Sequence, residues 1–237
     1  MQKILSTLIL ALLITPALFA ASECPSDKPV PESFISLFDG KTLNGWDADP
    51  KFWTVEDGCI TGRSTPENPV AHNSFLILRK VEKPQNFTLI ADFKMSPQCN
   101  SGCSFRSVEI KSEPWRILGT HADIFDHQNH MATFYRDGVM AWRGQDVTVK
   151  PGSPRKIEVT KQLGTPAEMM EKIDMYGWNT FKLYINGNRY ELWINGVLMS
   201  AVTDESLPQQ PEGVLGFQMH QGPPMVIQFR NVFFKNE

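Results

Sequence analysis

The stretch that decides the fold runs from Trp178 to Val202 and reads WNTFKLYINGNRYELWINGVLMSAV. Aromatic and β-branched residues dominate three short runs in it, which predict strands over Phe181–Ile185, Tyr190–Ile194 and Val197–Val202. The last two runs are separated only by Asn195-Gly196. Asn-Gly is a strong hairpin signal, because both turn residues need a positive φ that Asn and Gly tolerate best. The sequence therefore predicts an antiparallel meander.

A second segment, from Gly216 to Gly222, reads GFQMHQG and continues this strand pattern. The period of two along a strand places Gln218 and His220 on one face, and Phe217 and Met219 on the other. We expect the apolar face to pack and the polar face to be available for binding or catalysis.

The first residues have the order of a secretory signal peptide. Lys3 precedes the apolar run Leu8–Ile14, which is followed by Pro16 and small residues near Ala20. We expect residues 1–22 to be this signal. The apolar run is far shorter than the roughly 20 residues that a membrane-spanning helix needs. The sequence thus predicts a secreted or periplasmic protein with no stable membrane span, in which residues 34–237 form a single domain.

Length and charge limit the classes of partner. The chain has 237 residues and a formal net charge of -3, without a basic block that would attract a phosphate backbone. We therefore exclude nucleic acid as a partner. The oligomeric state is not encoded in these features.

Four cysteines follow the predicted signal, and an oxidising compartment favours their pairing. Cys99 and Cys103 bracket Asn100-Ser101-Gly102, which we expect to form a turn tight enough for a small disulfide loop. Cys24 would then pair with Cys59. A cysteine-rich metal site is disfavoured, because no C-x-x-C spacing is present.

Short apolar runs alternate with turn clusters from Phe34 onward. Many short strands at such spacing indicate an all-β sandwich. One segment departs from this pattern, because Thr165, Pro166 and Glu168 have the order of a capping box with proline at the first helical position. We expect one short helix there.

Several segments together resemble the 3-keto-disaccharide hydrolase family. The chain opens with FISLFDGKTLNGW over 34–46 and WTVEDG over 53–58, and further landmarks follow in order. These are Asn100-Ser101-Gly102 with Arg106, Gly119 to Ile124, Trp178-Asn179-Thr180, Trp193-Ile194-Asn195-Gly196, Gly216-Phe217-Gln218, and Phe229-Arg230-Asn231-Val232. The resemblance implies a concanavalin A-like jelly-roll sandwich of two antiparallel sheets whose concave face holds sugars.

The resemblance also implies a reaction. Members cleave a glycoside that is already oxidised to a ketone at C3, by elimination across C2 and C1 and then addition of water. Such a reaction needs a base for the C2 proton and an electrophile for the charge that develops on the ketone oxygen. We assign the base to His220, whose ordinary pKa suits proton transfer near neutrality. Arg106 is the expected electrophile, since a guanidinium polarises an oxygen without losing its proton.

A divalent metal ion is the alternative electrophile. His121 and Asp123 alternate on the predicted strand Gly119 to Ile124, so both are candidates to ligate one ion. Many members of the family have glutamine where His121 aligns, so this histidine departs from the family pattern. The identity of the ion is not specified by the sequence.

Substrate contacts are expected from the landmark segments and from aromatic rings. We assign Gln218 and Asn100 to substrate binding within their family-like segments, and Trp142 and Tyr135 as apolar platforms for a sugar ring.

Two other functions compete with this prediction. A lectin-like module would bind carbohydrate on the same face without catalysis. A conventional glycosidase would use two carboxylates, for which Glu109 and Glu113 are the candidates. Lys111 stands between them and would lower their pKa values, which opposes the raised pKa that a general acid needs.

Overall fold

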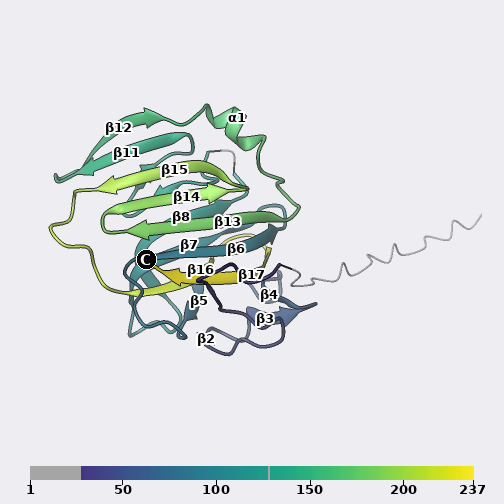
Figure 1. Ribbon diagram of the computed structural model, residues 1–237. Coiled ribbons are helices and arrows are strands. Elements are labelled where there is room, and N and C mark those ends of the chain that lie inside the picture. The colour runs from purple at the N-terminus through teal and green to yellow at the C-terminus, as the bar shows by residue number, and fades with distance from the viewer. Residues whose placement is uncertain (1–27, 128) are drawn as a thin grey trace, which may run out of the picture.

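A computed structural model describes residues 28–127 and 129–237, which form two β-sheets stacked on each other. Figure 1 shows the two layers, with β13, β14 and β15 in front of β7 and β8. In the first sheet the strand order is β12-β11-β15-β14-β13-β6-β17-β4-β3, and β1 pairs with β17. In the second sheet it is β10-β9-β8-β7-β16-β5-β2. The predicted two-sheet sandwich is confirmed.

The strands of the first sheet are β1 Ile35–Ser36, β3 Trp53–Glu56, β4 Cys59–Arg63, β6 Phe87–Met95, β11 Gln145–Lys150, β12 Lys156–Gln162, β13 Asn179–Asn186, β14 Arg189–Ile194, β15 Val197–Asp204 and β17 Val226–Asn236. Those of the second sheet are β2 Trp46–Asp47, β5 Ser74–Leu78, β7 Asn100–Glu109, β8 Ile117–Phe125, β9 Phe134–Tyr135, β10 Val139–Ala141 and β16 Val214–Met219.

The predicted meander is confirmed as β13, β14 and β15. Asn195 has φ 51° and Gly196 has φ 78°, so both turn residues between β14 and β15 adopt the left-handed conformation that the Asn-Gly pair favours. One pairing differs from the prediction of purely antiparallel sheets, because β11 runs parallel to β15. A parallel pair requires a long crossover, and the chain supplies one by passing through β12, a helix, β13 and β14.

Aromatic side chains fill the space between the sheets. Phe217 of β16 stacks on Phe229 of β17 with ring centroids 4.0 Å apart, and Phe105 of β7 meets Tyr190 of β14 at 5.2 Å. All four side chains are buried. Each buried aromatic ring contributes roughly 2–3 kcal/mol through removal from water, so truncating Phe217 to alanine should cost about 3–5 kcal/mol. This packing fixes which face of β7, β8 and β16 remains outside the core.

The predicted helix is confirmed as α1, Pro166–Met170. The Thr165 hydroxyl accepts from Glu168 N at 3.2 Å, and the Glu168 carboxylate accepts from Thr165 N at 3.0 Å. This capping box satisfies exposed backbone groups that a five-residue helix otherwise leaves to water. In Figure 1, α1 lies beside the ends of β11 and β12.

The predicted Cys99–Cys103 disulfide is wrong, since both thiols are free and buried. The turn falls earlier than expected, with Cys99 N donating to Ser96 O, and Asn100 already begins β7. Four residues of extended chain separate the two Cα atoms by roughly 13 Å, whereas a disulfide needs less than about 7 Å. Cys24 lies outside the described residues, so its pairing with Cys59 stays a prediction.

The predicted signal peptide, residues 1–22, also lies outside the described part of the chain. Across residues 28–127 and 129–237, the one helix is too short to cross a bilayer.

Candidate active site

Three neighbouring strands carry polar side chains on the sheet face that points away from the core. β7 lies between β8 and β16, with Gly102 opposite Asp123 and Ser104 opposite Gly216. Since Phe217 and Met219 are in the core, alternation places Gln218 and His220 on this outer face, as predicted. We call His121, Asp123, Gln218 and His220 the polar sheet face. Because Gly102 has no side chain, the His121 ring can lie directly over the backbone of β7.

His121 is a buried imidazole held from two sides. Its Nδ1 lies 2.8 Å from Ser104 Oγ, and its ring fills the space above Gly102, where a Cβ would stand 2.5 Å from Nε2. Burial lowers the pKa of His121 to about 4, which the Ser101 carbonyl opposes and the charge of His220 reinforces. The imidazole is therefore neutral at pH 7.

Asp123 is the carboxyl group of the polar sheet face. The Thr133 hydroxyl donates to its Oδ2 at 2.8 Å. Burial raises the pKa of Asp123 to about 6, although the Thr133 hydrogen bond and the charges of His130 and His220 lower it. A carboxyl group tuned to this range can exchange a proton close to neutral pH.

His220 follows β16 directly and is only partly buried. Its backbone N donates to Asn100 O at 3.2 Å, which ties it to the start of β7. Its Nδ1 lies 2.6 Å from Gln221 O. A carbonyl can only accept, so Nδ1 carries the proton and Nε2 keeps a lone pair. This is the tautomer that a general base requires.

His121 and Asp123 provide a partial fit to the predicted metal ion. Nε2 of His121 lies 3.4 Å from Asp123 Oδ1 and has no hydrogen-bond partner among the described residues. Ligand distances of about 2.0–2.2 Å place two tetrahedral donors roughly 3.3 Å apart, which matches this spacing. However, no third His, Cys, Asp or Glu of the described residues joins them. The described residues thus supply two metal-ligand donors, and we propose no reaction step that depends on an ion.

Aromatic side chains border the polar sheet face at the β9 side. Tyr135 pairs with His121 in register and is 44% exposed. Trp142, which is 40% exposed, lies with its ring centroid 5.3 Å from that of His130. The two predicted platforms are thus accessible at the edge of the site.

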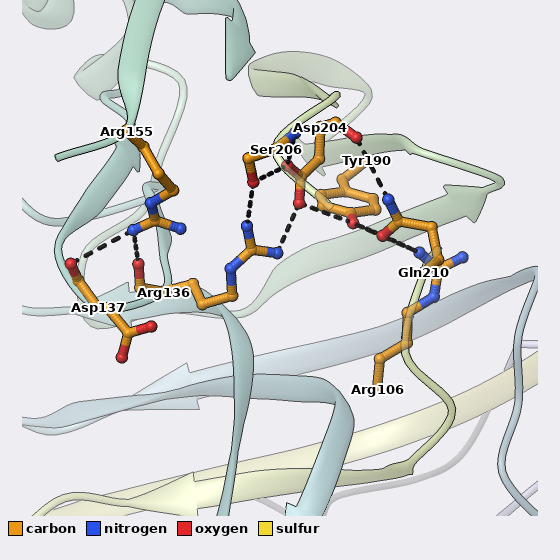
Figure 2. A network of polar contacts seen from close by, with 8 residues as sticks. All are labelled: Arg106, Arg136, Asp137, Arg155, Tyr190, Asp204, Ser206 and Gln210. Atoms are coloured by element: carbon orange, nitrogen blue, oxygen red, sulfur yellow. Dashed lines mark hydrogen bonds and ion pairs between the residues drawn. The ribbon is translucent and has the colours of Figure 1, made fainter. Parts of the chain in front are cut away.

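Arg106 does not belong to this site. Its guanidinium turns toward the first sheet, where Nη1 donates to Gln210 Oε1 at 2.9 Å and Nη2 donates to Gln85 O at 2.8 Å. Figure 2 shows Arg106 beside Tyr190, in a network that continues through Asp204 to Arg136. The predicted catalytic position of Arg106 is therefore corrected to a structural one.

A β-bulge explains why the Arg106 side chain points to the core side of β7 and not to its outer face. Arg106 has φ 50°, and the register between β7 and β8 shifts between Phe105 and Val108. The extra residue breaks the alternation, so Arg106 lies on the same side as Phe105. Strand periodicity alone places it on the opposite side.

The two candidate glycosidase carboxylates are both engaged in ion pairs. Arg79 holds Glu109 through two hydrogen bonds of 2.6 and 2.7 Å, and Arg116 pairs with Glu113. Arg79 lowers the pKa of Glu109. A neighbouring cation therefore opposes the raised pKa that a general acid needs, as expected. The cations are Arg79 and Arg116 rather than Lys111.

Sequence reasoning missed Ser104, Thr133 and His130. Ser104 alternates with Gly102 on β7, so strand periodicity carried a signal for it. Thr133 and His130 contact the site through the segment after β8, which has no such periodicity.

Comparison with known proteins supports the prediction that this is a carbohydrate-acting domain. The profile of a family described as 3-keto-alpha-glucoside-1,2-lyase-like domain matches residues 33–235. The chain is 34% identical over 115 residues to the 3-keto-disaccharide hydrolase of Bacteroides thetaiotaomicron, an alignment that covers 42% of this chain and 39% of that protein. The match thus spans well under half of that relative.

Solved structures share the fold. A protein of Parabacteroides distasonis assigned provisionally as a glycosyl hydrolase has a TM-score of 0.57 and 20% identity, covering 87% of this chain and 94% of that one. A carbohydrate-binding module of Bacillus subtilis has a TM-score of 0.50 and 17% identity, covering 81% and 95%. At these identities the likeness concerns the jelly-roll fold alone.

Proposed function

Because the chain belongs to the family of 3-keto-alpha-glucoside-1,2-lyase-like domains, we propose that it cleaves glycosides oxidised to a ketone at C3. One observation carries this proposal. The polar sheet face combines an imidazole whose Nδ1 is fixed by a carbonyl with a carboxyl group whose pKa is raised to about 6. An elimination needs such a base and such an acid, rather than two carboxylates.

His220 is the proposed base. The ketone at C3 acidifies the proton on C2, and the free Nε2 of His220 accepts it. The electron pair of the C2–H bond then forms the C1–C2 double bond as the C1–O bond to the leaving group breaks.

Asp123 is the proposed acid for the departing oxygen. In its protonated form it donates to that oxygen, so the leaving group departs as a neutral alcohol. Water then adds at C1 of the unsaturated ketone and gives one proton to the Asp123 carboxylate, while His220 returns its proton to C2. The sum of these steps is hydrolysis of the glycoside.

Negative charge on the ketone oxygen requires a donor, and Arg106 is not placed to provide one. We assign this role to the side-chain amide of Gln218, which lies on the outer face of β16 two residues before His220. A divalent ion, if bound, would be held by His121 and Asp123 and would supply positive charge for the same oxygen, with Asp123 then acting as a carboxylate ligand instead of the acid. We also propose export from the cytoplasm, on the basis of residues 1–22.

The test compares a 3-keto-glucoside with the matched unoxidised glucoside, with and without a chelator. Release of the leaving group from the oxidised sugar alone supports the proposal. Loss of turnover on chelation would assign stabilisation of the oxygen to an ion, and unchanged turnover would leave it with Gln218. Binding of both sugars without cleavage of either would instead indicate a lectin-like module.

A further inference from the structure

A groove lies at the edge of the sandwich, between the segment after β8, α1 and the first residues of β11. It consists of two adjoining cavities of about 910 and 430 Å³, which share Asn129, Arg143 and Pro166 in their walls. Cavities of about 300–1,000 Å³ are the size that small-molecule ligands occupy. None of the residues of the polar sheet face lines it.

The groove begins where the polar sheet face ends. Phe125 follows Asp123 by two residues on β8 and stacks on His127, which lines the larger cavity, with centroids 5.5 Å apart. The ring of His130 contacts that of Trp142, which lines the smaller cavity. Two ring contacts therefore connect the surroundings of Asp123 to the groove.

The charged side chains in the walls of the groove form hydrogen bonds to other groups of the protein. Asp126 Oδ2 accepts from Gln98 N at 2.6 Å, and the Tyr176 hydroxyl lies 3.3 Å from the same oxygen. Arg143, which is buried, donates to Met131 O at 2.8 Å and to Pro166 O at 3.1 Å. These contacts stabilise the walls and favour a ligand without net charge.

The remaining lining groups include neutral amides and aromatic faces, beside the aliphatic side chains of Ala167, Met170 and Met175. Gln145 and Gln162 lie directly opposite each other across β11 and β12. Gln145 Oε1 accepts from Trp142 N at 3.2 Å, which orients that amide beside the indole. Tyr176 is 49% exposed at the other end of the groove. Amide donors beside exposed rings suit the hydroxyl groups and apolar C–H faces of a sugar.

We propose that this groove binds the leaving-group sugar of a 3-keto-disaccharide, as a neutral hexose, while the oxidised ring lies on the polar sheet face. The inference rests on the proposed function. It assigns the groove residues to substrate specificity and makes the enzyme selective for disaccharides over glycosides with a small leaving group.

The test uses Gln162→Ala/Tyr176→Leu, in which both altered side chains are exposed, and circular dichroism checks that the variant is folded like the wild type. For the wild type and the variant, kcat/KM is measured with a 3-keto-disaccharide and with methyl 3-keto-glucoside. The ratio of the two values should fall on the order of tenfold in the variant, as expected for loss of a hydrogen bond and a ring contact. Gln209→Ala, at an exposed glutamine outside the groove, is the matched control and should leave the ratio unchanged.

An unchanged ratio in the double variant would overturn the proposal. If the wild type cleaves neither substrate, the proposed function fails, and binding of glucose by saturation-transfer NMR then tests the groove separately. A signal that weakens in the double variant but not in Gln209→Ala supports a sugar subsite. Equal signals in all three proteins rule it out.

Discussion

Nε2 of His121 faces Oδ1 of Asp123 at 3.4 Å, with both side chains held on the outer face of β8. Burial acts on the two groups in opposite directions, lowering the pKa of His121 to about 4 and raising that of Asp123 to about 6. Between these values both groups are uncharged in the folded protein. The site thus holds the His121 imidazole beside the Asp123 carboxyl group without a buried ion pair.

The first prediction concerns the pH dependence of stability in Asp123→Asn. In the wild type, the folded chain keeps the Asp123 proton up to pH 6, whereas the unfolded chain releases it near the ordinary value of 3.8. This favours folding at low pH, and the contribution is lost as pH rises through 6. His121 has the opposite effect, because from pH 6.5 down to about 4 only the unfolded chain binds its proton.

The Asp123 and His121 effects each change the free energy of unfolding by on the order of 3 kcal/mol between pH 6.5 and 4, in opposite directions. The two changes therefore nearly cancel in the wild type. Asp123→Asn leaves the His121 effect alone. The free energy of unfolding of this variant should therefore fall by about 3 kcal/mol more than that of the wild type between pH 6.5 and 4. Urea unfolding in the presence of a chelator measures this, with Glu212→Gln as an exposed control. Parallel pH curves for Asp123→Asn and the wild type would contradict it.

The second prediction concerns the base. His220→Gln removes the proton acceptor while keeping a polar side chain, so kcat on a 3-keto-glucoside should fall by roughly 100-fold or more. The same variant should bind the unoxidised glucoside as the wild type does, within about twofold. Activity close to the wild-type value would remove His220 from the mechanism.

The third prediction concerns the space under His121. A Cβ on Gly102 would stand 2.3 Å from Ala122 O and 2.5 Å from His121 Nε2, at a φ of 150°. Gly102→Ala should therefore displace the imidazole, lower the free energy of unfolding by about 2–4 kcal/mol and reduce activity. Gly138→Ala is the matched control, because Gly138 also has a positive φ but no atom within 4 Å of its Cβ position. Equal losses in both variants would show that the backbone conformation alone is responsible.

The fourth prediction separates structure from catalysis at Arg106. Arg106→Lys loses the paired hydrogen bonds to Gln210 and Gln85, and should destabilise the fold by about 2–4 kcal/mol. Any loss of activity should follow the fraction of folded protein, measured by circular dichroism at the assay temperature. A drop in kcat with the protein fully folded would instead indicate that Arg106 takes part in catalysis.

Local features were predictable from the sequence. The Asn195-Gly196 hairpin and the Thr165–Glu168 capping box depend on residues within one turn of each other, and both form as expected. Alternation correctly placed Gln218 with His220 on the side of the strand away from Phe217, because a β-strand repeats every two residues.

Only the tertiary structure decided which of these groups meet. The pairing of β7 with both β8 and β16 brings Asp123 and Gln218 to either side of Gly102. The bulge at Arg106 removes the expected guanidinium, and the early turn at Ser96 keeps Cys99 apart from Cys103. Strand register and bulges are set by packing between distant segments, which the spacing of residues along one strand does not contain.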